Sequence, residues 1–215
     1  MKILKPTLFL LLGLGITACS NPLKVHYDNI KLALLLNEDI AVTLEEVQNS
    51  EIDLALIRSG DRPLAKIAKA YHEFDKEKWI SKDRAMLVLK NYRIIKTVGF
   101  NNDLLAIFSG QKDPLSDIGG LNGKSWQWQV DWSAGEYGYD VSSNFNSSKD
   151  TVQIMGNSFN VLKITENIIY ADGSNWENIY WVDEESSLLL KTVQKGAPFA
   201  DRFEIDFVSN AARLM

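Results

Sequence analysis

The sequence predicts a mainly β protein built on an antiparallel curved sheet, which forms an open or half β-barrel or, alternatively, a sandwich, with a short N-terminal α-helix packed against it. From Glu51 onward the apolar period is two: Ile52, Leu54 and Leu56 share one face of a strand, and Glu51 and Asp53 share the other. Roughly a dozen such segments follow. Because the connections between them are too short for crossover helices, neighbouring strands are expected to be antiparallel.

The start of the chain has the features of a secretory leader. Lys2 and Lys5 precede an apolar run over residues 8–14, and small residues lead up to Cys19. The run is far shorter than the roughly 20 apolar residues that a membrane-spanning helix needs. The ending Ile16-Thr17-Ala18-Cys19 resembles a lipobox, so residues 1–18 are expected to be a lipoprotein signal peptide.

Cys19 is the only cysteine in the chain, which leaves no partner for a disulfide. A catalytic or buried thiol is the alternative, but an unmodified thiol would face an oxidising compartment after export. We expect a covalent lipid on Cys19 and no other cofactor, with acyl chains such as palmitate as the membrane attachment. Ser20 stands where an aspartate usually retains lipoproteins at the inner membrane. By that resemblance the protein is expected at the outer membrane, most simply on its periplasmic face.

Composition favours one acidic domain. The 215-residue chain has a formal charge of -5, and the leader removes only lysines, so the mature chain is more acidic still. Residues 19–25 are expected to form a tether and residues 26–215 a single lipoprotein domain. The most basic stretch, over residues 66–78, is interleaved with acidic residues. Nucleic acid is therefore not an expected partner, because a phosphate-binding protein needs a basic face.

Two helical segments are expected before the strands. Apolar residues between positions 26 and 37 recur at helical spacing, and Thr43 and Glu46 have the spacing of a capping box. After residues 52–56, the expected strands are 65–71, 85–90, 92–98, 104–108, 126–132, 137–144, 151–155, 158–170, 176–182, 188–194 and 202–208. Asn91, Gly156 and Gly173 supply turn residues between them, as hairpins require.

A barrel that crosses the outer membrane is the architectural alternative. Its strands need a continuous apolar outer band, whereas Asp53, Glu166, Glu177 and Glu204 interrupt the strands expected here. A lipid anchor would also be redundant on a spanning barrel. We therefore expect the sheet to form a domain beside the bilayer.

Tryptophans and amides supply the candidate ligand or partner surface. Trp126 and Trp128 share one strand face, which is typical of a core, and Gln127 and Gln129 share the opposite face. The alternative is a sugar-stacking platform with amide groups that pair with hydroxyls. Trp176 and Trp181 have opposite strand parity, so one of them should face away from the core. The candidate residues are Trp126, Trp128, Gln127, Gln129, Trp176 and Trp181.

No pattern in the sequence requires an enzyme or a metal. The two histidines, His26 and His72, are far apart, and no cysteine-containing ligand set is present. Gly123-Lys124-Ser125 lacks the upstream glycine of a phosphate-binding loop, and no Gly-x-Ser-x-Gly nucleophile elbow occurs. We therefore predict no catalytic residues and no metal ligands.

Several segments carry a family resemblance: Trp79–Val88, Arg93–Val98, Asn101–Leu105, Ser109–Leu115 and Tyr180–Asp183. They resemble the YjbF/GfcB family of outer-membrane lipoproteins. Members of that family are encoded with exopolysaccharide or group 4 capsule export genes, beside an outer-membrane β-barrel and a periplasmic protein. The resemblance implies a role in polysaccharide secretion or assembly, with those proteins as partners. It supplies no catalytic residues.

Three functions are compatible with these features. The first is a non-enzymatic accessory lipoprotein in exopolysaccharide or capsule secretion and assembly. The second is a module that binds a glycan or a lipid on the concave face of the half-barrel. The third is a polysaccharide-modifying enzyme, which would need two opposed carboxylates or an activated hydroxyl in a cleft.

Overall fold

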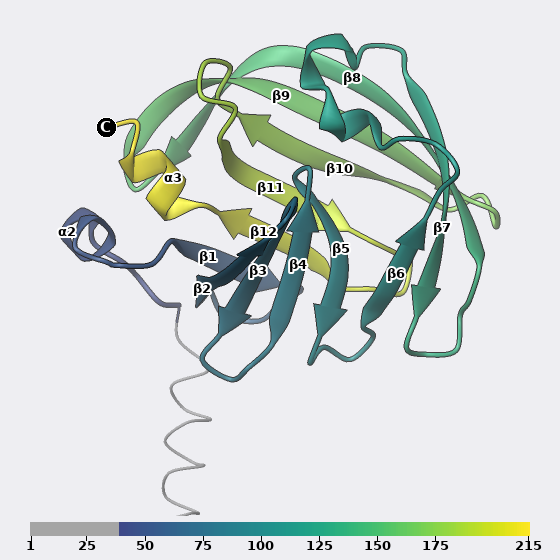
Figure 1. Cartoon of the computed structure of the whole chain (residues 1–215), viewed down its shortest axis with the longest axis horizontal. Coiled ribbons are helices and arrows are strands. Elements are labelled where there is room, and N and C mark those ends of the chain that lie inside the picture. Colours follow the sequence, from purple (N-terminus) through teal and green to yellow (C-terminus); the bar gives the residue numbers. More distant parts are fainter. Residues whose placement is uncertain (1–38) are drawn as a thin grey trace, which may run out of the picture. The chain divides into compact units, whose positions relative to one another are not determined.

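The computed structural model describes residues 39–215, and one antiparallel sheet of twelve strands dominates them (Figure 1). The predicted fold class is confirmed, with the sheet curled into a nearly closed barrel. The strands are β1 (Leu54–Ser59), β2 (Ala65–Glu73), β3 (Lys76–Ser81), β4 (Met86–Lys90), β5 (Arg93–Val98), β6 (Leu104–Phe108), β7 (Ser125–Trp132), β8 (Tyr139–Ile154), β9 (Asn157–Tyr170), β10 (Asn175–Val182), β11 (Leu189–Lys195) and β12 (Arg202–Asp206).

The expected leader, the lipidation residue Cys19, the tether and the helix over residues 26–37 all lie outside the described residues. Within residues 39–215, no helix is both long and apolar enough to cross a membrane.

The strand order explains how the sheet curls. It runs β5-β4-β3-β2-β1-β12-β11-β10-β9-β8-β7-β6, so the first and last strands pair in the middle and every other pair consists of strands that are consecutive in the chain. The two sheet edges are then β5 and β6, which are consecutive in the chain and lie side by side (Figure 1). No backbone ladder joins these two strands among the described pairings, so the barrel is closed there by side chains.

One interior side chain replaces the missing neighbour of β5. The Gln194 side chain, which comes from β11, accepts a hydrogen bond from the Ile94 N–H at 2.9 Å and donates one to the Tyr92 carbonyl at 2.8 Å. Gln194 is only 3% exposed. Unpaired buried backbone groups are costly, and the Gln194 amide supplies the hydrogen-bond partners that the Ile94 N–H and the Tyr92 carbonyl lack at this open sheet edge.

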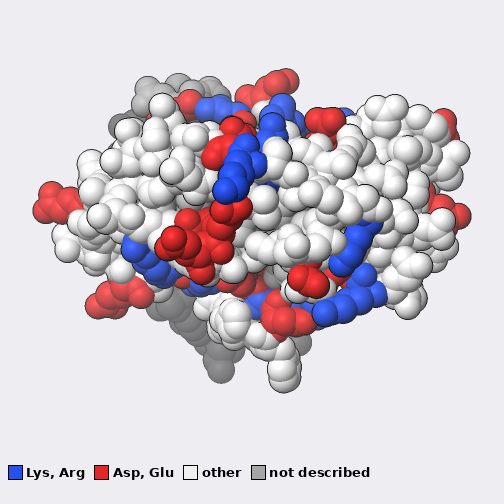
Figure 2. All heavy atoms as spheres, turned by 90° about the horizontal axis from the view of Figure 1, so that it is seen from above, with Lys and Arg blue, Asp and Glu red and all other residues white. Residues whose placement is uncertain are grey.

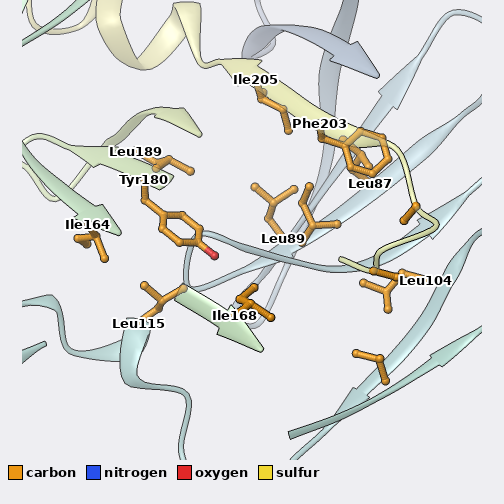
Figure 3. Close-up of a cluster of buried hydrophobic side chains, with 14 of the residues drawn as sticks. Leu87, Leu89, Leu104, Leu115, Ile164, Ile168, Tyr180, Leu189, Phe203 and Ile205 are labelled. Carbon is orange, nitrogen blue, oxygen red and sulfur yellow. The ribbon is translucent and has the colours of Figure 1, made fainter. Parts of the chain in front are cut away.

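The barrel interior is a continuous apolar core. On β7 burial alternates strictly from Trp126 to Trp132, and the even-numbered residues, including Trp128, point inward. This confirms the expectation that these tryptophans form a core face. Figure 3 shows leucine and isoleucine side chains from opposite walls meeting around Tyr180. Each large side chain buried in this way contributes roughly 1.5–3 kcal/mol, which makes the interior the main source of stability.

A second, smaller core lies on the outer face of the sheet. The helices α2 (Leu44–Gln48) and α3 (Val208–Ala212) cover it, and Val47 and Val208 pack there against Leu54 and Leu56 of β1. Ala55 and Ile57 of the same strand point into the barrel. Strand β1 is therefore buried on both faces over residues 54–57, which explains the unbroken apolar run at these positions.

Half of the expected capping box forms. The Thr43 side chain accepts the Glu46 backbone N–H at 3.1 Å and begins α2. The Glu46 carboxylate instead accepts from Lys66 Nζ at 2.6 Å. The threonine half of the prediction is thus confirmed, and the glutamate is used in an ion pair with β2.

Several strand assignments differ from the sequence expectations. Strand β1 spans Leu54–Ser59 where residues 52–56 were expected, so Ile52 lies before the strand. Strand β3 was missed because its alternating charges resemble a solvated surface, although Trp79 at its centre is 1% exposed. The expected strands 137–144 and 151–155 are one strand, β8, because β9 continues the ladder past the polar middle of the hairpin. The last expected strand ends earlier, since Val208 begins α3.

Candidate functional site

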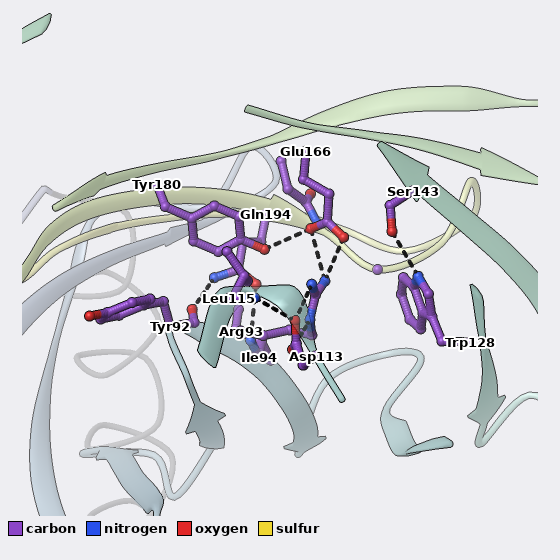
Figure 4. Close-up of polar contacts among 12 residues, drawn as sticks. Tyr92, Arg93, Ile94, Asp113, Leu115, Trp128, Ser143, Glu166, Tyr180 and Gln194 are labelled. Carbon is purple, nitrogen blue, oxygen red and sulfur yellow. Dashed lines mark hydrogen bonds and ion pairs between the residues drawn. The ribbon is translucent and has the colours of Figure 1, made fainter. Parts of the chain in front are cut away.

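A buried ion cluster occupies the middle of the barrel interior. Arg93 of β5 donates from Nη1 to both carboxylate oxygens of Glu166 on β9, at 2.9 and 2.8 Å. Its Nε and Nη2 donate to Asp113 at 2.8 and 3.2 Å. The Arg93 side chain is 2% exposed and that of Glu166 is 0% exposed. Figure 4 shows the guanidinium between the two carboxylates.

Aromatic residues complete this cluster. The Arg93 guanidinium lies over the Trp126 and Trp128 rings, 4.6 and 5.4 Å from their centroids, as in cation–π contacts. The Tyr180 hydroxyl donates to Glu166 at 2.9 Å. Burial alone would lower the pKa of Arg93, but the charges of Asp113 and Glu166 raise it well above its usual value. Burial, followed by the charge of Glu166, raises the pKa of Tyr180.

The ion cluster fastens the β6–β7 connection to the core. Besides binding Arg93, Asp113 accepts the Leu115 N–H at 3.0 Å and so caps the short 3-10 helix η1 (Pro114–Ser116). Leu115 and Leu121, before and after the second 3-10 helix, η2 (Ile118–Gly120), are each 1% exposed and belong to the main core. The arrangement is therefore structural: it holds a charged side chain and a loop in place.

Little space remains for a ligand inside the described barrel. The cavity beside Arg93, Asn178 and Gln194 has a volume of about 20 Å³, close to the room one water molecule needs. A hollow of about 300 Å³ opens elsewhere, where Leu115, Leu189 and other core residues meet a rim that includes Lys69 and Arg213. Within the described residues, this hollow is therefore the space left for a glycan or lipid on the concave face of the sheet.

A more voluminous groove, of about 800 Å³, lies across the outer face of β6–β9. Cross-strand pairing places Phe108, Gln129 and Asp140 in one row. The same pairing places Gln127, Ser142 and Ile169 in the next row. Members of a row belong to adjacent strands, where facing side chains lie about 5 Å apart. The six side chains thus form a two-by-three array on one surface.

The polar groups of the groove are oriented by short hydrogen bonds. Gln129 Nε2 donates to Asp140 Oδ1 at 2.8 Å. The Ser109 hydroxyl donates to the Gln127 carbonyl at 2.7 Å, so the start of the β6–β7 loop is attached to the rim. The Gln127 side-chain amide has no hydrogen bond to any other residue in 39–215. Phe108 and Ile169 remain 52% and 43% exposed, respectively. The groove therefore offers free amide, hydroxyl and apolar surface together.

The structure divides the sequence-predicted surface residues between two faces. Gln127 and Gln129 lie in the outer groove, whereas Trp126 and Trp128 are 3% and 4% exposed and point into the barrel. Stacked on each other with centroids 5.2 Å apart, the two rings support Arg93.

The other two predicted tryptophans lie on opposite faces of β10, as their parity indicated. Trp176 packs against the main core and tilts over Tyr170, with ring centroids 4.1 Å apart. Trp181 packs against the outer core, and its Nε1 donates to Asp150 at 3.1 Å. Neither contributes to the groove on β6–β9.

The other members of the array were not expected from the sequence: Phe108, Asp140, Ser142 and Ile169. They lie on three different strands, and only the ladder register aligns them. The signal available was weak: each has the outward parity of its strand, but nothing in the sequence gives the register. Within the described part of the chain, no cluster of three or more histidine, cysteine or acidic residues has the geometry to hold a metal ion.

The strands and loops that build both sites fall within one family match. The family model described as "Group 4 capsule polysaccharide lipoprotein gfcB, YjbF" matches residues 27–208. That range includes all twelve strands, the ion cluster and the groove.

Individual relatives are similar over most of their length. The chain is 26% identical to the uncharacterized lipoprotein GfcB of Escherichia coli K12 over 196 residues, which is 89% of this chain and 92% of that protein. It is 23% identical to the uncharacterized lipoprotein YjbF of the same organism, over 91% and 94% of the two chains. The crystal structure of the hypothetical lipoprotein YmcC from Escherichia coli K12 is similar with a TM-score of 0.70 at 26% identity, over 84% of this chain and 94% of that one.

Proposed function

Since this chain belongs to the group 4 capsule polysaccharide lipoprotein family of GfcB and YjbF, we propose that it is a non-enzymatic accessory in exopolysaccharide or capsule secretion and assembly. In this proposal acyl chains on Cys19 hold it at the outer membrane, with the domain on the periplasmic side. It works beside the outer-membrane β-barrel and periplasmic proteins of the same export system.

The observation that carries the proposal is the extent of the family match. It covers residues 27–208 and therefore the folded domain, from before α2 to the start of α3. A match confined to the leader would indicate only how the protein is exported. Because the domain itself matches, the description of the family as capsule polysaccharide lipoproteins supports this proposal for the folded domain.

The chemistry of the buried carboxylates supports a non-enzymatic role. Glycoside hydrolases place two carboxyl groups about 5–9.5 Å apart on opposed walls of an open cleft. Here Glu166 and Asp113 both bind Arg93, beside a cavity of only about 20 Å³. Among the described residues that line the outer groove, Asp140 is the only acidic one.

The charge distribution fits a protein that is held at a membrane by lipid more than by electrostatic attraction. The formal charge is -5, and Figure 2 shows acidic and basic side chains interleaved on the face in view, with wide uncharged areas beside them. Anionic lipid surfaces attract clusters of basic residues. Acyl chains would therefore have to supply the attachment.

Deletion of the gene tests the proposal. We expect extracellular polysaccharide per cell to fall in the deletion strain and to return when the full-length chain is re-expressed. A Cys19→Ser chain, which has no thiol for acylation, should restore little or none. Unchanged polysaccharide in the deletion strain would refute the accessory role. Full restoration by the Cys19→Ser chain would refute the anchor alone.

A second candidate function is direct glycan binding. The outer groove on β6–β9 favours it, because exposed apolar and hydrogen-bonding groups converge there.

A further inference from the structure

The array in the outer groove has the dimensions of a small carbohydrate site. It spans four strands: the first row lies on β6, β7 and β8, and the second row, offset by one strand, lies on β7, β8 and β9. With strands about 4.8 Å apart and a rise of about 3.4 Å per residue, each row is about 10 Å long, the rows lie about 7 Å apart, and the array extends over about 14 Å across the strands. The groove volume of about 800 Å³ lies in the range of small-molecule sites, roughly 300–1,000 Å³.

The chemistry of the array matches an uncharged sugar ring. A pyranose has apolar C–H faces and a rim of hydroxyl groups. Phe108, which is 52% exposed, offers an aromatic face at one corner, and Ile169 offers apolar surface at the opposite corner. Between them, Gln127 and Ser142 can donate and accept hydrogen bonds, as hydroxyl groups require. The second oxygen of Asp140 can accept further hydrogen bonds.

The charge of the groove selects against anionic ligands. None of its lining residues within 39–215 is lysine or arginine, and Asp140 contributes a negative charge. A carboxylate or phosphate placed about 4 Å from Asp140 would meet a repulsion of about 1 kcal/mol even in water, and no lysine or arginine among the described lining residues offsets it. Uronic acids, phospholipid headgroups and nucleic acids are therefore poor occupants.

We propose that the outer groove on β6–β9 binds a neutral segment of polysaccharide. Phe108 and Ile169 contact its C–H faces, and Gln127, Gln129, Ser142 and Asp140 bind its hydroxyls. The inference deepens the proposed function, because it names the surface and the class of glycan that the accessory lipoprotein would engage. It does not depend on the barrel interior.

Binding by the full acylated protein in mild detergent tests the groove. The probes are neutral hexasaccharides (maltohexaose, cellohexaose and chitohexaose), oligogalacturonate as the anionic probe, and fragments of the parent strain's own exopolysaccharide. Saturation-transfer NMR identifies a bound probe, and titration calorimetry gives its affinity. Phe108→Ala and Gln127→Ala remove an aromatic and a hydrogen-bonding contact, respectively. Phe74→Ala is the matched control, because Phe74 is 92% exposed and lies outside the groove.

We expect at least one neutral probe to bind and Phe108→Ala to weaken it about five- to tenfold, the loss of one aromatic contact. Phe74→Ala should leave the affinity unchanged. Asp140→Asn should raise affinity for oligogalacturonate about fivefold at low salt, because it removes the nearby negative charge. Circular dichroism confirms that each variant is folded, which is expected because the altered side chains face solvent.

Absence of binding by every probe would overturn the inference, as would binding that Phe108→Ala and Gln127→Ala leave unchanged. Preference for oligogalacturonate would contradict the charge argument. These outcomes differ from failure of the proposed function. If no glycan binds but the deletion strain has an export defect, the groove proposal is refuted and the accessory role is kept. If glycan binds in the groove but the deletion strain exports normally, the accessory role is refuted and the groove proposal is kept.

Discussion

Replacement of Arg93 by methionine should destabilise the fold strongly. The substitution roughly preserves the side-chain length but removes every ion pair of the interior cluster: Arg93 binds Glu166 at 2.8 Å and Asp113 at 2.8 Å, with side-chain exposures of 2%, 0% and 16%, respectively. Both carboxylates would then lack their cation, and Glu166 would be buried as an uncompensated charge. Removal of one partner from a buried pair costs about 3–5 kcal/mol.

That loss is large for a domain of this size. Typical stabilities are about 5–15 kcal/mol, so Arg93→Met would remove about a fifth of the free energy of unfolding or more. At about 2–4 °C per kcal/mol, Tm should fall by roughly 6–20 °C. Unfolding in guanidinium chloride, followed by tryptophan fluorescence, is a suitable assay, because the rings of Trp126 and Trp128 contact the Arg93 side chain.

A double-mutant cycle isolates the ion pair from packing effects. Glu166→Gln in the Arg93→Met background removes the buried charge, so it should recover part of the lost stability. Arg93→Lys keeps the charge but cannot reach both carboxylates in bidentate geometry, and should be intermediate. The reasoning is refuted if Arg93→Met costs less than about 1 kcal/mol, or if Glu166→Gln gives no recovery in that background.

Three further substitutions test other contacts. Lys69→Met should cost about 1–3 kcal/mol at neutral pH, because Lys69 Nζ lies 2.5 Å from Asp53. Burial raises the pKa of Asp53, but Lys69 and Arg213 outweigh burial and hold this pKa below 3.8. The ion pair therefore stabilises the fold above pH 3.8, and the stability difference between Lys69→Met and wild type should shrink as the pH falls below 3.8. Gly196→Ala should cost about 1–3 kcal/mol in chemical unfolding, because the new Cβ would lie 2.8 Å from the buried Trp132 ring. Gln194→Leu should cost about 1–3 kcal/mol by leaving the β5 edge unpaired, with faster amide exchange there.

Each of these has an internal check. A Lys69→Met penalty that stays constant down to pH 2 would contradict the assigned pKa direction of Asp53. Gly119→Ala is the control for the glycine substitution, since its nearest neighbour would be 3.7 Å away, and equal costs at both sites would argue against the Trp132 contact. Unchanged exchange of the Ile94 amide in Gln194→Leu would show that the side chain does not protect that edge.

Local patterns in the sequence were sufficient for much of the fold. Alternation gave the strand positions and the inward orientation of Trp126 and Trp128, because side-chain direction in a strand depends only on parity. It failed for β3, where Glu77 forms an ion pair with Lys69 of β2 and Lys76 is exposed, and these charges conceal the buried Trp79. Local residue types alone do not distinguish charges that are paired across strands from charges that are solvated.

Long-range pairing was beyond the reach of such patterns. The interior cluster joins Arg93 to Glu166, 73 residues away, and the sequence analysis treated Glu166 only as an interruption in an apolar strand. The outer groove depends on register across four strands, and only its amides, Gln127 and Gln129, were identified in advance. The contacts that close the barrel and the register of its strands are properties of the assembled sheet, so neither can be predicted from any one segment.

The partition of polysaccharide between the periplasm and the cell surface tests the central claim most directly. The measurement compares cells depleted of this protein with cells that express it, and quantifies the polymer in both compartments. If the protein assists export or assembly, total polymer should stay constant while the surface fraction falls. An unchanged surface fraction would contradict the account, as would a loss of total polymer, since that would indicate a role in synthesis.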